Sequence, residues 1–249
     1  FQDDDVIHVN GSPNPLSDFQ DINLELILSD ITVTQKYLNN LKKSKRPIKN
    51  KIELINDIEL LLKHLSNEKP ARVFQYTDNL SELTDLKLLT NKPMFVIANV
   101  DENIKDIDKF RADNEVEMIV PINAVVEQEI ASLNREEQQI FLQDLGMKET
   151  ALERIIKTGY DLLGLKTFFT SGEKESRAWA AKKTFNASEC SGIIHSDIEK
   201  GFIRAETISY DDYIKFGGEQ SSKNNGVWRQ EGKDYLVQEG DVIYFRFNV

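Results

Sequence analysis

The sequence is poor in several residue types and patterns, and each shortage excludes a class of protein. Its 249 residues include one cysteine, Cys190, so no internal disulfide framework can form and a reducing cytosol suits the chain. The 3 histidines are scattered and no C-x-x-C pair occurs, so no metal-binding pattern is visible. No stretch approaches the roughly 18 apolar residues of a membrane-spanning helix. The formal net charge of −11 argues against a generic nucleic-acid binder, which usually has a basic face.

The first residues do not look like the start of a protein. The segment FQDDDVIHV has neither a Met nor a basic n-region, so it is not a signal peptide. We therefore predict that Phe1 is an internal residue of a longer protein. Cys190 is predicted to be a small packing residue rather than a catalytic thiol, since no histidine partner is implied.

Apolar spacing predicts a helical hairpin, with Asp18 as the cap of its first helix. From Leu24 to Leu41 apolar residues recur at alternating three- and four-residue steps, with one polar break. A basic turn then leads into a return helix of similar length, about eighteen residues. The return seam is Ile48, Ile55 and Leu62, with Ile52, Ile58 and Leu65 beside it. The pattern indicates a short antiparallel coiled-coil arm, whose basic turn is a solvated tip or, less favoured, an RNA contact.

The next region alternates strands and helices. Apolar runs at 93–98 and 118–122 are typical of buried parallel strands. A helix through Ile107 and Phe110 is expected between them, and Asn123 is predicted to cap the helix that follows the second strand. Two further helices are predicted at about 135–145 and 150–163, with Gly146 as a C-cap between them. This order predicts part of a doubly wound parallel sheet.

The last passage, about 165–249, changes character. Short strand candidates are separated by turns that contain glycine, and one helix is evident at 209–216. We predict a mixed sheet around that single helix. The strand candidates are residues 168–169, 191–195, 202–208, 235–237 and 242–247.

Ligands of doubly wound proteins bind beyond the carboxyl ends of the strands. The first such end is Asn99-Val100-Asp101-Glu102, in the register of the GTPase base-recognition motif NKxD with two substitutions. Glu102 is one methylene longer than the Asp that accepts from guanine, and the Asn99 amide can meet the N6 amine of adenine. Val100 replaces the Lys and can lie flat against a purine. The segment therefore indicates relaxed selection of guanine and a binding preference shifted towards adenine. Polar residues after a buried strand are, however, commonly only helix caps.

The second strand end strengthens the base-site interpretation. Asn123, Ala124 and Val125 occupy the place where GTPases put a loop whose backbone N–H groups meet the base. A simple capping role for Asn123 is compatible with this function. The predicted nucleotide-binding residues are therefore Asn99, Val100, Glu102, Asn123, Ala124 and Val125.

Longer segments resemble one known family over essentially the whole chain, the YchF-type, Obg-related ATPases. The matches include DDDVIHV, FVIANVDE, P-N-A-V-x-E-x-E-I and FLQDLG. The more specific ones lie near the carboxyl end: FFTSGEKESRAW, GIIHSDIEKGFIRAE, SYDDYIKFGGE and GKDYLVQEGDVIYFRFNV. These last segments are similar to the family's TGS domain, which has a β-grasp fold.

The resemblance implies a protein of three parts. Residues 1–21 and 91–164 would form the base-recognition half of a P-loop G domain, residues 22–90 the inserted arm, and residues 165–249 the TGS domain. It also implies Mg²⁺-dependent ATP hydrolysis with weaker GTP binding, a cytoplasmic location, and association with the ribosome's large subunit. An RNA contact through the TGS domain or the arm is a further candidate.

One departure from the family is large. The phosphate loop G-x-x-x-x-G-K-[ST] and the switch segments do not occur in this sequence and should lie upstream of Phe1. No catalytic or Mg²⁺-binding residue can therefore be assigned here. The leading hypothesis is an ATP-dependent switch acting in translation. The alternative is an RNA- or ribosome-binding adaptor in which nucleotide only regulates affinity, and the chain taken alone is expected to be inactive as an ATPase.

Overall fold

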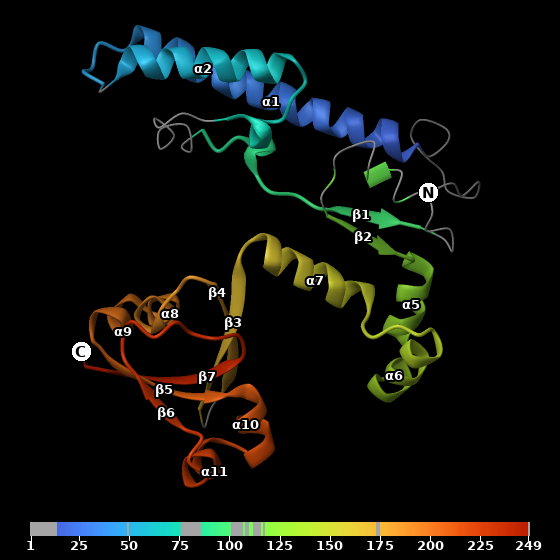
Figure 1. The fold of residues 1–249 in the computed structure, drawn as a ribbon, viewed down its shortest axis with the longest axis vertical. Helices are drawn as coiled ribbons and strands as arrows, with labels where there is room; N and C mark the ends of the chain where they lie inside the picture. Colours follow the sequence, from blue (N-terminus) through green and yellow to red (C-terminus); the bar gives the residue numbers. More distant parts are fainter. Residues whose placement is uncertain are drawn as a thin grey trace. The chain divides into compact units, whose positions relative to one another are not determined.

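The computed structural model describes residues 14–48, 50–75, 86–100, 107, 110–111, 116, 118–172 and 175–248 (Figure 1). The chain divides into two compact units, Phe1–Ile155 and Ile156–Val249. Each unit has hydrophobic clusters of its own. No helix within the described ranges is both long and apolar enough to cross a membrane.

The first unit begins with a pair of helices, α1 (Pro15–Lys43) and α2 (Lys51–Ser66). The predicted cap at Asp18 is wrong, because α1 begins earlier and is capped by Asn14, whose side chain accepts from Ser17 N at 3.3 Å. Pro15 stands at the first helical position, where its fixed φ suits a helix and its missing N–H costs nothing. Asp18 lies in the first turn, where a carboxylate is favoured by the helix dipole.

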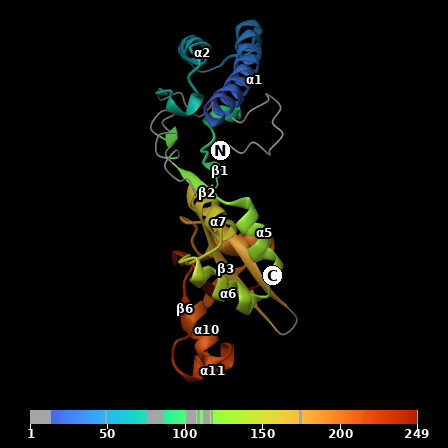
Figure 2. The ribbon, with the colours of Figure 1, turned by 90° about the vertical axis from the view of Figure 1, so that its right-hand side faces the viewer.

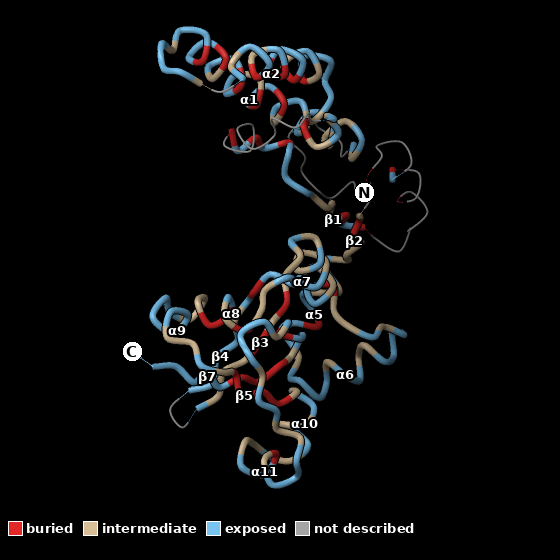
Figure 3. The backbone as a smooth tube through the Cα atoms, turned by 60° about the vertical axis from the view of Figure 1, so that its left-hand side comes forward, coloured by how far each residue is buried: buried red, intermediate tan, exposed pale blue. Residues whose placement is uncertain are grey.

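An apolar seam joins the two helices, and Figure 3 shows buried positions recurring along both. The predicted seam of α1 is largely confirmed, although Leu24 is 37% exposed. On α2 the seam is rotated from the predicted one, because Ile55 and Leu62 are only partly buried and Ile52 is 78% exposed. The fully buried seam residues are Ile27, Thr34, Leu38 and Leu41 on α1, and Leu54, Ile58, Leu61 and Leu65 on α2.

A buried carboxylate ties the helical pair to the chain that leads into the sheet. Asp30 of α1 is 1% exposed, and its oxygens accept from Leu89 N at 2.7 Å, Thr90 N at 2.8 Å and Thr90 Oγ1 at 2.6 Å. Thr90 Oγ1 also accepts from Ala71 N at 2.9 Å. These bonds fix two 3₁₀ turns, η1 (Ala71–Val73) and η2 (Leu89–Asn91), against one helix. A buried charge is tolerated because backbone and hydroxyl donors surround it.

Two short strands follow, β1 (Val96–Asn99) and β2 (Ile119–Ile122), and they lie side by side (Figures 1 and 2). They pair in parallel, as predicted, and the register places Val96 opposite Ile119 and Asn99 opposite Ile122. Of the helix expected between them, residues 107 and 110–111 are described and are helical. The helices after β2 are α5 (Ala124–Ser132), α6 (Arg135–Asp144) and α7 (Ala151–Leu162), close to the predicted ranges. Gly146, with φ +67°, follows α6 as predicted.

The second unit contains a mixed five-stranded sheet in the order β4-β3-β7-β5-β6. Only β3 and β7 pair in parallel. One face packs on α8 around Phe168, Ile243 and Phe245, whereas α10 and α11 lie on the other side of the sheet (Figure 1). The strands are β3 (Leu165–Ser171), β4 (Ser176–Lys182), β5 (Phe202–Ser209), β6 (Arg229–Glu231) and β7 (Asp241–Phe247). The helices are α8 (Ala187–Ile194), α9 (Ser196–Lys200), α10 (Tyr210–Phe216) and α11 (Glu219–Asn224).

Several predictions for this unit are wrong. Residues 191–195 were expected to form a strand, but 191–194 belong to α8, which begins with a capping box between Asn186 and Glu189. The cap satisfies the first helical N–H groups and so overrides the apolar Ile193-Ile194 pair that suggested a strand. Residues 235–237 are not the predicted strand either, and form a single β-bridge from Leu236 to Asn186. The strands β4 and β6 were not predicted from the sequence. The single helix expected at 209–216 is α10, and this unit also contains α8, α9 and α11.

A buried lysine holds three backbone segments of this unit together. Lys166 is 3% exposed, and its Nζ donates to the carbonyl oxygens of Lys183 at 3.1 Å, Phe185 at 2.7 Å and Val237 at 2.6 Å. An ammonium group has three N–H donors, so these bonds use all of them. Residues 183–185 and Val237 have little strand pairing of their own, and these bonds connect them to β3 instead.

We expect Asp30→Asn to loosen η2. The neutral amide keeps one acceptor oxygen without its charge and turns an N–H donor towards the N–H group of either Leu89 or Thr90, at a cost of about 2–3 kcal/mol. Amide hydrogen exchange at Leu89 and Thr90 should accelerate about 30-fold or more. Asp21→Asn, an exposed aspartate on the same helix, is the matched control. Unchanged exchange at both amides in Asp30→Asn would contradict this account.

We expect Lys166→Met to destabilise the second unit by about 3 kcal/mol, because three buried carbonyls lose their donor while the aliphatic stem is kept. Both tryptophans, Trp179 and Trp228, lie in this unit, so urea unfolding followed by tryptophan fluorescence reports on it alone. Lys233→Met, at an exposed lysine, should leave the transition in place. An equal shift in the two variants would argue that the three carbonyl contacts do not stabilise the unit.

Candidate functional site

The candidate site lies where β1 and β2 end. Asn99 is the last residue of β1, and Asn123 follows the last residue of β2. Since the strands are parallel and Asn99 is in register with Ile122, both ends meet at one edge of the sheet. The backbone ladder continues beyond β1, because Val100 N donates to Ile122 O at 2.8 Å.

Two asparagine side chains organise the beginning of α5. Asn123 Oδ1 accepts from Val125 N at 3.1 Å and Val126 N at 3.2 Å, which confirms the predicted N-cap. Asn99 Oδ1 accepts from Ala124 N at 3.2 Å and so links the two strand ends directly. The N–H groups of the first 3 residues of α5 are therefore all bonded to asparagine oxygens. Asn99 and Ala124 are exposed, and Val125 is 67% exposed, so this edge is open to a ligand.

The sequence also predicted Val100 and Glu102 as residues of the site. Val100 is 7% exposed and packs in a cluster with Ala98, Ile107 and Phe110. A flat contact between its side chain and a purine would require the valine to turn outward. Glu102 lies outside the described residues, so its geometry relative to Asn99 stays a prediction.

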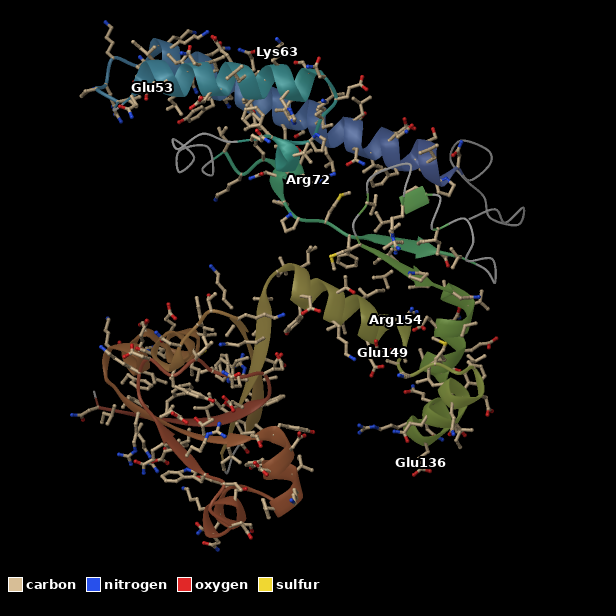
Figure 4. All side chains as sticks on the ribbon, in the orientation of Figure 1. Glu53, Lys63, Arg72, Glu136, Glu149 and Arg154 are labelled. Atoms are coloured by element: carbon tan, nitrogen blue, oxygen red, sulfur yellow. The ribbon has the colours of Figure 1, made fainter. Side chains whose placement is uncertain are left out.

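The start of α7 braces the loop after β2, which the sequence did not indicate. Arg154, labelled in Figure 4, donates from Nη2 to the carbonyl oxygen of Pro121 at 3.0 Å. Its Nε is buried and makes no hydrogen bond within the described residues. Glu127 of α5 accepts from Ala151 N at 2.8 Å. No short-range pattern could reveal these contacts, because they join residues 24 and 33 positions apart.

The described residues contain no group of three His, Cys, Asp or Glu side chains that could hold a metal ion. They therefore do not fit a Mg²⁺ site of that kind. Cys190 is fully buried in the second unit, and burial raises its pKa to about 11, so it is a neutral thiol at physiological pH. This state agrees with the predicted packing role, because the thiolate is the reactive form.

The side chains at the ends of β1 and β2 are suited to hydrogen-bonding a planar polar group. No catalytic group is identified among the described residues of this site. The site places two asparagine amide groups at an exposed strand edge, and amide groups can fix the orientation of a base. A phosphate-binding loop would be needed for phosphoryl transfer. The printed sequence has no G-x-x-x-x-G-K-[ST] segment.

Known proteins resemble both units. Residues 165–248 match the family model YchF-GTPase_C, described as a protein of unknown function (DUF933). A Bacillus subtilis (strain 168) protein named "Ribosome-binding ATPase YchF" is 44% identical over 261 residues, which cover 100% of this chain and 71% of that protein. Proteins of the same name from Haemophilus influenzae and Escherichia coli O157:H7 are 44% and 42% identical over 257 residues, with the same coverage.

A solved structure also matches. The Schizosaccharomyces pombe YchF GTPase superposes with a TM-score of 0.78 at 28% sequence identity. The match covers 98% of this chain and 69% of that one.

Proposed function

The chain belongs to the YchF family, and on this premise we propose that the intact protein binds and hydrolyses ATP as a Mg²⁺-dependent switch associated with the ribosome. Relatives at 42–44% identity over 100% of this chain bear the name ribosome-binding ATPase. The proposal extends that description to nucleotide preference, to the residues of the base site and to a cytoplasmic location.

The architecture proposed for this function has three parts. Residues 1–21 and 91–164 form the base-recognition half of a doubly wound G domain, which the parallel β1–β2 pair supports. Residues 22–90 form a coiled-coil arm, supported by the buried seam between α1 and α2. Residues 165–249 form a TGS domain of β-grasp type, supported by a mixed sheet that packs on α8.

The observation that carries the nucleotide preference is the bond from Ala124 N to Asn99 Oδ1. Guanine presents the O6 acceptor where adenine presents the N6 amine donor. Because the N–H of Ala124 already donates to Asn99, it is not offered to a guanine O6. Adenine offers its N6 amine as a donor at this position, and the amide oxygen of Asn99 is an acceptor of the matching type. The loop therefore favours ATP over GTP.

The other residues have supporting roles in the proposal. Asn123 holds the loop in place through its cap, and Val125 supplies exposed apolar surface beside the base. Val100 occupies the position of the NKxD lysine and removes that lysine's charge from the site. Glu102 occupies the position of the NKxD carboxylate, displaced by one methylene. Phosphate, Mg²⁺ and catalytic contacts are assigned to no residue of this sequence, which has no phosphate loop.

The partner proposed for the intact protein is the large ribosomal subunit. ATP would order the switch segments, and the arm and TGS domain would carry that change to the ribosome. The alternative is an adaptor in which nucleotide only regulates affinity for RNA or the ribosome. An ATP turnover rate that the large subunit leaves unaltered, together with tight nucleotide-independent binding, would favour the adaptor.

We expect Val100→Lys combined with Glu102→Asp to move the intact protein's preference towards GTP. The double variant restores the NKxD pattern, and a good hydrogen-bonded pair to a base discriminates by about 1–3 kcal/mol, so the ratio of ATP to GTP affinity should fall at least about fivefold. Isothermal titration with non-hydrolysable analogues of ATP and GTP provides the measurement. Glu102→Asp alone is the companion variant, because a lysine at the buried position 100 could destabilise the domain. Unchanged ratios in both variants would refute the base-site assignment.

We expect the 249-residue chain alone to have no ATPase activity, because it contains no phosphate loop. Phosphate release by the chain should equal the no-enzyme background, whereas the intact protein should release phosphate when Mg²⁺ is present. Turnover by the chain alone would show that the catalytic groups lie among its residues.

A further inference from the structure

An open groove of about 440 Å³ lies on the second unit, whereas the residues of the predicted base site belong to the first. It is on the side of the sheet opposite α8, because Phe169 of β3 faces away from its neighbour Phe168, which is buried in the core. The residues that line the groove are Phe169, Ser209, Tyr210, Asp211, Glu239 and Gly240.

The lining comes from three segments that carry the family resemblance. Phe169 belongs to FFTSGEKESRAW, residues 209–211 begin SYDDYIKFGGE, and residues 239–240 lie in GKDYLVQEGDVIYFRFNV. Packing does not account for these side chains, since Tyr210 is 48% exposed and Asp211 and Glu239 are also exposed. Segments far apart in the sequence thus meet at one exposed place.

Backbone contacts hold the groove in shape. Tyr210 N donates to Gly240 O at 2.9 Å, and Gly240 N donates to Thr167 O at 2.9 Å. Glu239 Oε2 accepts from Thr167 N at 2.9 Å, which fixes that carboxylate at the rim. Gly240 has φ +79°, and a Cβ there would stand 3.4 Å from Tyr210 Cβ, so both the turn and the approach of the tyrosine favour glycine.

The chemistry of the groove suits a flat cation. The aromatic residues Phe169 and Tyr210 both line the groove, with their ring centroids 5.6 Å apart and the rings tilted by 36°. Asp211 has no hydrogen-bond or ion-pair partner among the described residues, and no lysine or arginine lines the groove. Aromatic faces attract cations, and arginine stacks on them better than lysine does. A phosphate would meet two carboxylates and no cation here.

We propose that this groove binds an arginine side chain of a basic protein segment, with the guanidinium between the aromatic pair and the carboxylates of Asp211 and Glu239. The segment is assigned to a ribosomal protein rather than to ribosomal RNA. The choice of a ribosomal protein as the partner rests on the proposed ribosome association. The arginine-binding site is inferred from the lining of the groove alone.

The first experiment titrates the ¹⁵N-labelled 249-residue chain with acetyl-Arg-Arg-Arg-amide and follows the amide resonances of Tyr210 and Gly240. Asp211→Asn and Glu239→Gln should each weaken binding about two- to fivefold, because each removes one exposed ion pair. The glutamine keeps an oxygen for Thr167 N, so the groove should remain intact. Phe169→Leu should weaken binding by a similar factor through the lost cation–π contact.

Asp234→Asn is the matched control, because it removes an exposed carboxylate of the same unit outside the groove. It should leave the affinity unchanged. Equal affinity of the wild-type, Asp211→Asn and Glu239→Gln chains for tri-arginine would overturn the site. An oligo-uridine that shifts the same two amides at the same concentration would overturn the preference for protein over RNA.

The second experiment measures co-sedimentation of the intact protein with salt-washed ribosomes. The double variant Asp211→Asn with Glu239→Gln should sediment less than wild type, and Asp234→Asn should sediment equally. Full sedimentation of a double variant that has lost tri-arginine binding would overturn a ribosomal protein as the partner. Absence of wild-type sedimentation would instead contradict the proposed ribosome association, and the peptide titration would then decide the groove by itself.

Discussion

The parallel pairing of β1 with β2 is the constraint on which the candidate site depends. Parallel strands end at the same edge of a sheet, so the pairing brings Asn99 and Asn123 together although 24 positions separate them. The two amides then bond the N–H groups that open α5. Those donors would otherwise be unpaired at a helix start. In the proposed base site, the way they are satisfied is what would distinguish adenine from guanine.

Each unit also contains a buried charged side chain that binds several backbone or hydroxyl groups at once. Asp30 accepts from η2 and so anchors the chain that enters β1, while Lys166 donates to three carbonyls in the second unit. Within the described ranges neither side chain forms an ion pair, and hydrogen bonds satisfy both. This arrangement joins segments that regular secondary structure leaves unconnected.

Local signals predicted part of the fold well. The apolar runs of β1 and β2 and the cap at Asn123 depend on neighbouring residues and are confirmed. The heptad-like spacing of α1 is also local, and it is confirmed except at Leu24. The errors arose where one local signal outweighed another. The Ile193-Ile194 pair suggested a strand, yet the capping box at Asn186 made the segment helical. The strands β4 and β6 lie at the sheet edges, where alternating burial is weak.

The sequence by itself determined the family, the helical pair and the parallel strands β1 and β2, and it suggested the candidate base-site residues, because these follow from spacing and motif. Only the tertiary structure decided the inward direction of Val100, the bond between Asn99 and Ala124 and the brace from Arg154 to Pro121. It also assembled the groove at Phe169, Tyr210 and Asp211 from three separate segments. Such contacts depend on which surfaces meet when the chain packs, and pairing between residues distant in sequence leaves no local pattern to read.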